Sequence, residues 1–277
     1  IVTTVRFSIN FLPRTTELWN KLRPALFPTR CDLQTFKKRA MSSREYPKAW
    51  EKFERTIDGS TMKFVVEDIS EAMWSTAVEF MLGNYIKEDV WWSAAGTARD
   101  PEAVQEYRVL LTSLVRQKMS LACFLADGDG SGHTLVGVNI CMPQSKGQFV
   151  DHNPPKTEAG LLSLRMFAEA MKVPVIYDKY GLGEYLMGAG LSVAPEYRRL
   201  GIATKLLTAR VALARTLGFR ATGGIFTSEH GQQAAEKAGY ECLYTLPYHK
   251  FGKRCNITFN SSTQDLKIYA FNTFNTK

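Results

Sequence analysis

From Met62 onward, short apolar runs alternate with amphipathic stretches, and turn-forming residues separate them. Apolar runs bounded by Gly, Pro, Asn or Asp are typical of strands, whereas apolar positions spaced by three and four are typical of helices. The pattern predicts strands at residues 63–69, 120–126, 134–142, 186–193, 220–227, 240–246 and 266–271. It predicts helices at residues 71–85, 101–118, 156–172, 202–217 and 229–238. Strands and helices mixed in this order predict an α/β domain.

Several predicted helices carry terminal signals. Ser70 and Ser228 each precede an acidic residue and are candidate N-caps, and Pro101 suits a first helical position. Gly218 follows the last apolar position of its helix and predicts its end. Between the elements we expect a turn-rich hairpin at 127–132, a polar loop at 148–155 and an irregular connection at 173–184.

The segment from Met187 to Leu207 combines a strand, a basic Gly-containing loop and a helix. The first N–H groups of a helix are unpaired and lie at the positive end of its dipole, so they can bind an anion. Gly201 and Ala203 leave the backbone accessible, and Arg198 and Arg199 add fixed positive charge. The loop alone is equally compatible with a tight connection that binds nothing.

Length and composition narrow the class of protein. A chain of 277 residues with 45% apolar residues can bury one substantial core, and no apolar run approaches the ~20 residues that a membrane span requires. Five scattered cysteines, none in a C-x-x-C spacing, favour a reducing compartment over a disulfide scaffold, and they predict no zinc site. We therefore expect a cytoplasmic protein without a metal and without a membrane partner.

The net charge of +8 is concentrated at the start of the chain. Residues 1–55 hold 12 Lys and Arg against 5 Asp and Glu, whereas residues 56–277 are nearly neutral. This distribution argues against a nucleic-acid-binding role for the body of the protein. Residues 1–40 are basic, interrupted by prolines and without clear periodicity, so they are interpreted as a non-core extension, a linker or leader rather than a targeting signal. Residues 41–277 are expected to form a single domain.

The loop fits Arg-x-x-Gly-x-Ala and follows a strand that ends in Leu-Ser-Val. This pattern resembles the pyrophosphate-binding motif of the acetyl-CoA-dependent GNAT N-acetyltransferases, and the order of elements over 62–271 resembles their fold. The resemblance implies a mixed central sheet of about six to seven strands with flanking helices and a splayed, bulged central strand. It implies that Leu191 and Val193 bind pantetheine through their backbones. It also implies that the pyrophosphate of acetyl-CoA is held by Arg198, Arg199, Gly201, Ile202, Ala203 and Thr204.

A narrower resemblance rests on Asn-Tyr-Ile-Lys-Glu-Asp-Val at 84–90, on the Gly-Leu-Ser-Val strand and on Glu-Lys-Ala-Gly-Tyr at 236–240. All three are similar to insect arylalkylamine N-acetyltransferases, which acetylate dopamine, serotonin and related amines. That family uses the glutamate of an Asp-Glu pair as general base, and this chain reverses the pair. Position favours Asp89 as the base, whereas residue type favours Glu88.

Other family positions differ in this chain. Where family members carry two serines, Thr227 keeps a hydroxyl and Gly231 does not, and Ala235 stands where many GNAT enzymes have an acidic tyrosine.

The resemblance as a whole implies a monomeric enzyme acting on a small-molecule amine. A GNAT enzyme for a polyamine, a fatty-acyl acceptor or a protein N-terminus, and a non-catalytic acetyl-CoA binder, remain alternatives. Tyr85, Trp91, Trp92 and Tyr185 are candidates for an aromatic amine pocket.

Overall fold

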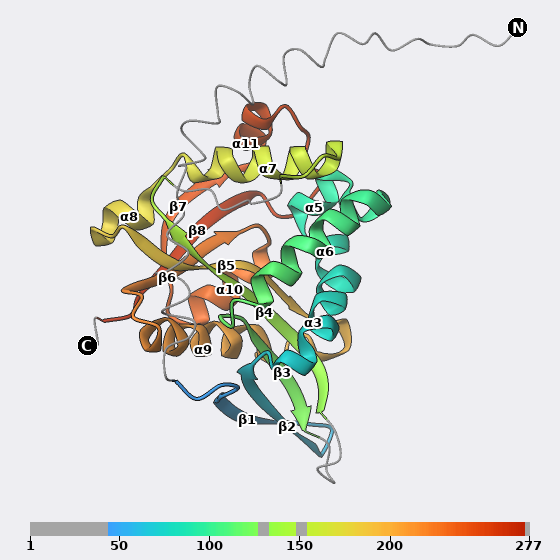
Figure 1. The fold of residues 1–277 in the computed structure, drawn as a ribbon, viewed down its shortest axis with the longest axis vertical. Helices are drawn as coiled ribbons and strands as arrows, with labels where there is room; N and C mark the ends of the chain where they lie inside the picture. Colours follow the sequence, from blue (N-terminus) through green and yellow to red (C-terminus); the bar gives the residue numbers. More distant parts are fainter. Residues whose placement is uncertain (1–43, 127–132, 148–153, 275–277) are drawn as a thin grey trace, which may run out of the picture.

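A mixed sheet runs through the whole domain and carries helices on both faces (Figure 1). The computed structural model describes residues 44–126, 133–147 and 154–274. Within them the sheet has eight strands in the order β1-β2-β3-β4-β5-β6-β8-β7, and only β5 and β6 are parallel neighbours. The strands are β1 (Ala49–Ile57), β2 (Ser60–Asp68), β3 (Leu121–Ala126), β4 (His133–Ser145), β5 (Glu184–Val193), β6 (Ala221–Phe226), β7 (Glu241–Pro247) and β8 (Asp265–Asn272).

The helices surround this sheet and vary in length. The longer ones are α3 (Trp74–Phe80), α6 (Pro101–Val115), α7 (Glu158–Met171), α9 (Ile202–Thr216), α10 (Glu229–Lys237) and α11 (Tyr248–Cys255). Short helices are α4 (Ile86–Glu88), α5 (Val90–Ala95) and α8 (Val175–Tyr180), together with the 3-10 turns η1 (Glu71–Met73), η3 (Thr97–Arg99) and η4 (Pro195–Tyr197). A π-helical turn, η2 (Met81–Tyr85), joins α3 to α4.

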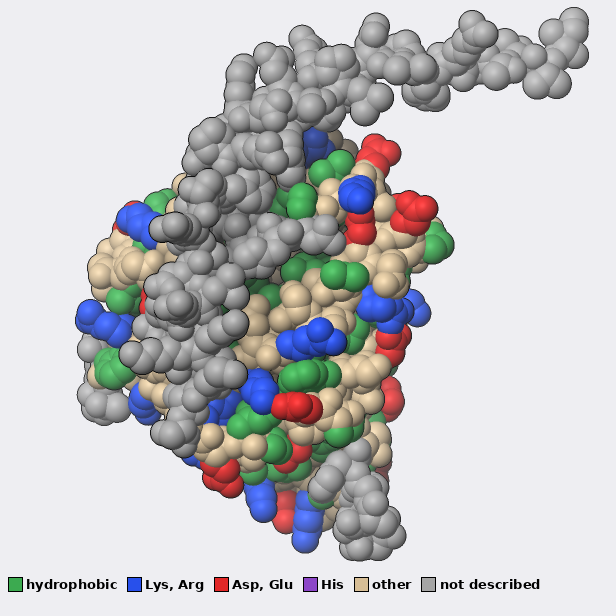
Figure 2. Space-filling model, in the orientation of Figure 1, with side chains coloured by type: hydrophobic (Ala, Val, Ile, Leu, Met, Phe, Trp, Pro, Cys, Tyr) green, Lys and Arg blue, Asp and Glu red, His purple; other side chains and the backbone are tan. Residues whose placement is uncertain are grey.

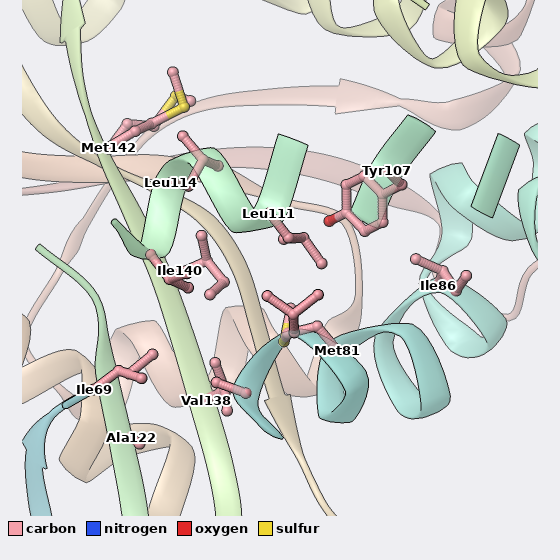
Figure 3. Packing of buried hydrophobic residues seen from close by; sticks show 14 of the residues in the cluster. Ile69, Met81, Ile86, Tyr107, Leu111, Leu114, Ala122, Val138, Ile140 and Met142 are labelled. Carbon is pink, nitrogen blue, oxygen red and sulfur yellow. The ribbon is translucent and has the colours of Figure 1, made fainter. Parts of the chain in front are cut away.

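Successive strand residues belong to two hydrophobic clusters, one on each face of the sheet. Val65 packs with α3, η2 and α6, whereas its neighbours Phe64 and Val66 pack with α9. Figure 3 shows the first cluster, in which Met81 and Leu111 lie close to Ile140 of β4. Because side chains of a strand alternate between faces, a sheet covered on both sides needs such continuous apolar runs. The buried faces fix the register of the strands that form the site.

All seven strands expected from the sequence are present, with ends shifted by a few residues. The eighth, β1, was missed, because only Trp50, Phe53 and Ile57 are large apolar residues in it and charged residues separate them. It pairs with β2 through a turn at Asp58 and Gly59, both with positive φ. An Asp-Gly pair between two strands is a strong hairpin signal, and it would have identified β1.

The helix predictions need several corrections. Residues 173–184 are not irregular, because Val175–Tyr180 form α8, which ends at Gly181 in the left-handed region. Ser70 does precede the first helix, but its side chain makes no capping bond there. Instead its carbonyl accepts the N–H of Met73 in a 3-10 turn. Helices α5 and α11 were also missed, since six and eight residues are too few to show a period.

Other predicted ends are confirmed. The Ser228 side chain accepts the N–H of Gly231 at the start of α10, and Pro101 opens α6. Gly218 has a φ of +78° just beyond α9. The expected hairpin at 127–132, most of the loop at 148–155 and the extension at 1–40 lie outside the described residues.

The central strand β5 has the expected bulge and splay. Ile140 of β4 pairs with Gly190 while Cys141 pairs with Gly188, so Ala189 is the extra residue of a bulge. On its other side β5 pairs with β6 only at Leu186 and Met187. Beyond Met187 the two parallel strands separate, and β5 continues alone toward Val193.

The described surface agrees with the nearly neutral body expected from the sequence. On the face in Figure 2, basic and acidic side chains are interspersed over the described residues. Over the same residues, no helix has the length and apolar character to cross a membrane. No group of three or more His, Cys, Asp or Glu side chains in the described ranges is placed to hold a metal ion.

Candidate active site

A large cavity of about 1930 Å³ opens beside the splay between β5 and β6. Its walls come from the C-terminal halves of β5 and β6, the start of α9, the segment around α5, and the facing sides of α6 and α7. The loop Arg198–Thr204 and the two acids Glu88 and Asp89 all contribute to its lining. Residues separated by more than 100 positions therefore meet at one cavity.

The basic loop presents an uncapped helix start to this cavity. Gly201 is the N-cap of α9, with a φ of +82° that favours glycine, and no side chain caps the helix. Arg199 also has a positive φ, 66°. Residues held in this region without being glycine carry strain and cluster at binding sites. The N–H groups at the start of α9 are thus available to an anion.

Strand β1 holds this loop from the side. Arg55 donates a 2.8 Å hydrogen bond from Nε to the carbonyl oxygen of Leu200. Lys205, in the first turn of α9, forms an ion pair with Glu51. Glu51 and Arg55 are separated by four residues of one strand and therefore share a face. Sequence reasoning missed this support because it missed the strand.

Leu191 and Val193 lie on the isolated part of β5. Both line the cavity and are half-buried, and both pair with β4, opposite Asn139 and Gly137. Neither pairs with β6. Asn139 is fully buried and donates from Nδ2 to the carbonyl of Gly190 at 2.8 Å, next to the bulge. The strand expected to contact pantetheine is therefore fixed on one side and accessible on the other.

The two adjacent acids have different surroundings. Glu88 is exposed, and its Oε2 lies 2.5 Å from Nη2 of Arg198 in the basic loop. Asp89 is only 7% exposed. It is the N-cap of α5, where its Oδ1 accepts the N–H groups of Trp91 at 2.9 Å and Trp92 at 3.3 Å.

Thr227 connects Asp89 to the end of β6. Its hydroxyl donates to Oδ2 of Asp89 at 2.5 Å, and its own carbonyl accepts the hydroxyl of Tyr248 at 2.7 Å. Burial raises the pKa of the Asp89 carboxyl above its ordinary value, although the bonds from Thr227, Trp91, Trp92 and Tyr85 oppose the rise. A carboxylate with a raised pKa in a cavity is a candidate general base.

Aromatic side chains enclose this carboxylate. Tyr85, Trp91 and Trp92 line the cavity as expected, and Trp92 packs against Tyr107 with ring centroids 4.1 Å apart. Burial, and secondarily the charge of Asp89, raises the pKa of Tyr107 well above its ordinary value. The hydroxyl of Tyr107 is buried without a hydrogen-bond partner among the described residues. Sequence reasoning did not single out Tyr107, since its spacing in α6 is that of a core residue.

Tyr185 corrects one of the aromatic expectations. It is 2% exposed, packs edge-on against Tyr177 at 5.2 Å and does not line the cavity. Trp91 has a mixed role, because it borders the cavity yet stacks on Phe251 at 5.4 Å.

Of the positions that differ from the family pattern, Gly231 lines the cavity and Ala235 does not. Gly231 and His230, at the start of α10, line it, and His230 is exposed. Ala235 is completely buried and packs with Leu207 and Tyr240. Hence α10 offers no hydroxyl where many GNAT enzymes have their acidic tyrosine.

Part of the chain matches a known protein family. Residues 159–240 match the model of the Acetyltransferase (GNAT) family, a range that contains β5, the basic loop, α9, β6 and α10. A search of curated proteins found no match.

Solved insect structures are similar over most of the chain. The provisionally named arylalkylamine N-acetyltransferase 7 of the yellow fever mosquito is 25% identical, with a TM-score of 0.75 over 84% of this chain and 98% of that one. A Drosophila melanogaster polyamine N-acetyltransferase that forms N-acetylagmatine is 17% identical, with a TM-score of 0.60 over 76% and 99%. Arylalkylamine N-acetyltransferase 2 from Aedes aegypti is 15% identical, with the same TM-score and coverage.

The last two likenesses, both below 25% identity, concern the fold alone. The eight-stranded sheet is the GNAT fold with one strand more than the upper count expected. Acetyl-CoA is the cosubstrate of GNAT acetyltransferases. The chain therefore carries a GNAT acyltransferase domain that uses acetyl-CoA and resembles the insect arylalkylamine N-acetyltransferases.

Proposed function

We propose that this protein transfers the acetyl group of acetyl-CoA directly to a primary amine, and that the amine is an arylalkylamine such as dopamine, serotonin, tryptamine or tyramine. One observation carries the proposal. The buried, Thr227-bonded carboxylate of Asp89 shares a cavity with the uncapped start of α9. A proton acceptor and an anion site thus border one space that can hold both reactants.

The cofactor is proposed to lie along the isolated part of β5. Its pyrophosphate would contact the loop Arg198–Thr204, where helix N–H groups and two guanidinium groups favour negative charge. Its pantetheine would follow the backbone of Leu191 and Val193, which has no partner on the β6 side. This placement directs the thioester toward the splay, close to the wall that carries Asp89.

The amine must lose a proton before it can attack. An alkylammonium has a pKa near ~10, so a neighbouring base is required at neutral pH. We place this role on Asp89, whereas the exposed Glu88 is engaged by Arg198. The proton passes from the amine to Asp89 directly or through the hydroxyl of Thr227, which already donates to the carboxylate.

Acyl transfer then follows with few further demands on the protein. The amine nitrogen forms a bond to the thioester carbonyl carbon, the carbon–sulfur bond breaks, and the thiolate takes a proton from solvent or from Asp89. A thiol with a pKa of about 8.5 is a fair leaving group even without the tyrosine that Ala235 replaces. Proximity of both reactants and removal of the proton supply the main catalytic effects.

The aromatic wall supports an arylalkylamine. Tyr85, Trp92 and Tyr107 surround the carboxylate, and such rings favour flat or cationic ligands. The competing acceptor class is an aliphatic polyamine, which would gain less from these rings. We further propose a cytoplasmic monomer, in line with the free thiols of the four described cysteines, Cys123, Cys141, Cys242 and Cys255.

The decisive experiment combines two measurements. Calorimetric titration with acetyl-CoA tests the cofactor site, and a thiol-release assay with dopamine, serotonin, tryptamine, tyramine, agmatine and spermidine tests the acceptor. We expect binding and release, with the four arylalkylamines preferred. Thiol release only with agmatine or spermidine would show that the acceptor is a polyamine. Binding without release for any amine would identify a non-catalytic acetyl-CoA binder.

A further inference from the structure

Arg210 is the largest completely buried side chain among the described residues. It projects from α9, and its Nε donates to the hydroxyl of Tyr240 at 3.2 Å. Its Nη1 reaches Oδ1 of Asn139 only at 3.5 Å, and its Nη2 is buried without a partner. The guanidinium carbon lies 5.2 Å from the centre of the Tyr240 ring. The described partners of this cation are therefore all neutral.

No carboxylate of the described residues neutralises Arg210, although other arginines of the domain have acidic partners. The titratable groups that face it are Tyr185, Tyr240 and Cys141. Burial raises the pKa of each, that of Cys141 to about 11, so all three are uncharged at neutral pH. Removing an ion from water is costly, and neutral contacts recover only part of that cost. A buried guanidinium of this kind is typical of a site that binds an anion.

Its location is the apex of the splay between β5 and β6. A Cβ atom at Gly188 would lie 1.9 Å from Nη1, so the guanidinium fills the space that a side chain of β5 would take. A Cβ atom at Gly224 of β6 would lie 3.1 Å from the carbonyl oxygen of Gly188. Two glycines thus bring the strands together around Arg210. Gly188, Arg210 and Gly224 all line the cavity of the candidate active site.

The distance along β5 relates this cation to the reacting centre. If the thioester lies near Leu191, the apex at Gly188 is three residues further along the strand, about 10 Å at ~3.3 Å per residue. A two-carbon acetyl group cannot span that length, whereas a longer acyl group or the side of an acceptor molecule can approach it. The apex therefore offers room and positive charge beyond the acetyl group.

We propose that Arg210 binds a carboxylate beside the reacting centre, supplied either by the far end of a dicarboxylic acyl-CoA or by an amino-acid acceptor. A planar carboxylate accepts two parallel hydrogen bonds from a guanidinium, and Nη2 has its donors free for this. The inference rests on the proposed placement of acetyl-CoA along β5. It adds a class of reactant to the arylalkylamine reaction.

The unaltered protein provides the first test, in two matched pairs. Succinyl-CoA is compared with butyryl-CoA as donor to tyramine, and tyrosine is compared with tyramine as acceptor from acetyl-CoA. The members of each pair are close in size and differ mainly in a carboxylate. We expect kcat/KM to favour the carboxylate by tenfold or more in one pair, and that pair identifies the source. Ratios below tenfold in both pairs overturn the inference.

Substitution provides the second test. Arg210→Gln should abolish the preference while acetyl-CoA and tyramine still react, and Arg210→Lys should retain part of it. The control is Arg215→Gln on the same helix, whose Nε donates to the carbonyl of Thr273 away from the cavity. A preference that survives in a folded Arg210→Gln protein overturns the inference. If that variant does not fold, the ratios of the unaltered protein decide alone.

Failure of the proposed function is separable from failure of this inference. An unaltered protein that releases no thiol from acetyl-CoA with any amine contradicts the function. In that case titration with succinyl-CoA and butyryl-CoA still measures the carboxylate site. Tighter binding of succinyl-CoA by tenfold supports the role of Arg210, and equal binding contradicts it.

Discussion

Arg198 and Glu88, 110 positions apart in the chain, form an ion pair of 2.5 Å between the cofactor loop and the helix end that precedes Asp89. The pair is solvent-exposed, with side-chain accessibilities of 42% and 52%. Exposed pairs contribute about 1 kcal/mol or less. In the proposed site, the pyrophosphate of acetyl-CoA competes with Glu88 for the same guanidinium.

The first prediction concerns Glu88→Gln, which removes this competition. We expect the dissociation constant of acetyl-CoA to fall by up to about fivefold, because Arg198 is then free for the phosphate. Turnover should stay within a few-fold of the unaltered protein. Calorimetry and steady-state kinetics test both expectations, and a hundredfold loss of turnover would return the role of base to Glu88.

The second prediction concerns Asp89→Asn. The amide keeps an oxygen that can cap α5, but it cannot accept the amine proton, so turnover should fall by about 10²- to 10⁴-fold. The affinity for acetyl-CoA should be unchanged. Asp100→Asn is the matched control, because Asp100 caps α6 in the same way, through the N–H groups of Glu102 and Ala103, outside the cavity. Equal activity of the two variants would exclude Asp89 as the base.

The third prediction concerns the pH dependence of the reaction. Thr227 donates to the charged form of Asp89 and so lowers a pKa that burial raises. Thr227→Val removes this bond and should raise the pKa further, which moves the acidic limb of kcat/KM to higher pH. Thr227→Ser retains the hydroxyl and should leave the limb in place. Identical pH profiles for all three proteins would show that the group titrating in the acidic limb is not Asp89.

The fourth prediction concerns Gly201→Val. The substitution forces a β-branched residue into a φ of +82° and directs its Cβ to 3.1 Å from Arg55. We expect acetyl-CoA to bind more than tenfold more weakly, a loss of at least ~1.4 kcal/mol. Gly218→Val is the control, since it meets similar backbone strain at the other end of α9, at a φ of +78° with open space around it. Unchanged affinity for acetyl-CoA in both variants would show that the loop does not bind the cofactor.

The fifth prediction concerns the start of the domain. Arg44 lies 2.6 Å from the fully buried Asp68, which also accepts the N–H of Lys48 and the indole of Trp50. A protein that begins at Met41 should therefore keep its thermal midpoint and turnover. One that begins at Pro47 leaves Asp68 without its cation and should lose about 3 to 5 kcal/mol. Failure of the longer protein to fold would place residues 1–40 in the core.

Sequence patterns identified the elements with strong apolar periods and the loop with a family motif. Strand β1 was not predicted because Glu51, Lys52, Glu54 and Arg55 interrupt its apolar pattern. Of these four, Arg55 bonds to the cofactor loop and Glu51 pairs with Lys205 just after it. Short helices such as α5 escaped because their end signals, Asp89 and Gly96, lack a period between them.

The candidate site was predictable only in part for a related reason. The motif located the loop and the acid pair, yet no pattern told which acid faces the cavity. That choice depends on α5, because capping it turns Asp89 inward and leaves Glu88 on the surface. Tyr107 has the spacing of a core residue. Arg210, as a charged residue, is expected to point away from the apolar face of its helix, and the structure corrects this, because Arg210 is buried at the cavity.

The bond from Arg55 to the carbonyl of Leu200 makes the first hairpin a partner of the cofactor loop. The coupling free energy between two sites acts equally in both directions. If the hairpin strengthens cofactor binding, bound cofactor therefore stabilises the hairpin by the same amount. Amide hydrogens of β1 and β2 should consequently exchange more slowly once acetyl-CoA is bound, although no atom of these strands belongs to the reaction. Hydrogen exchange in this edge hairpin would therefore show whether the cofactor is bound, even when no acceptor is present.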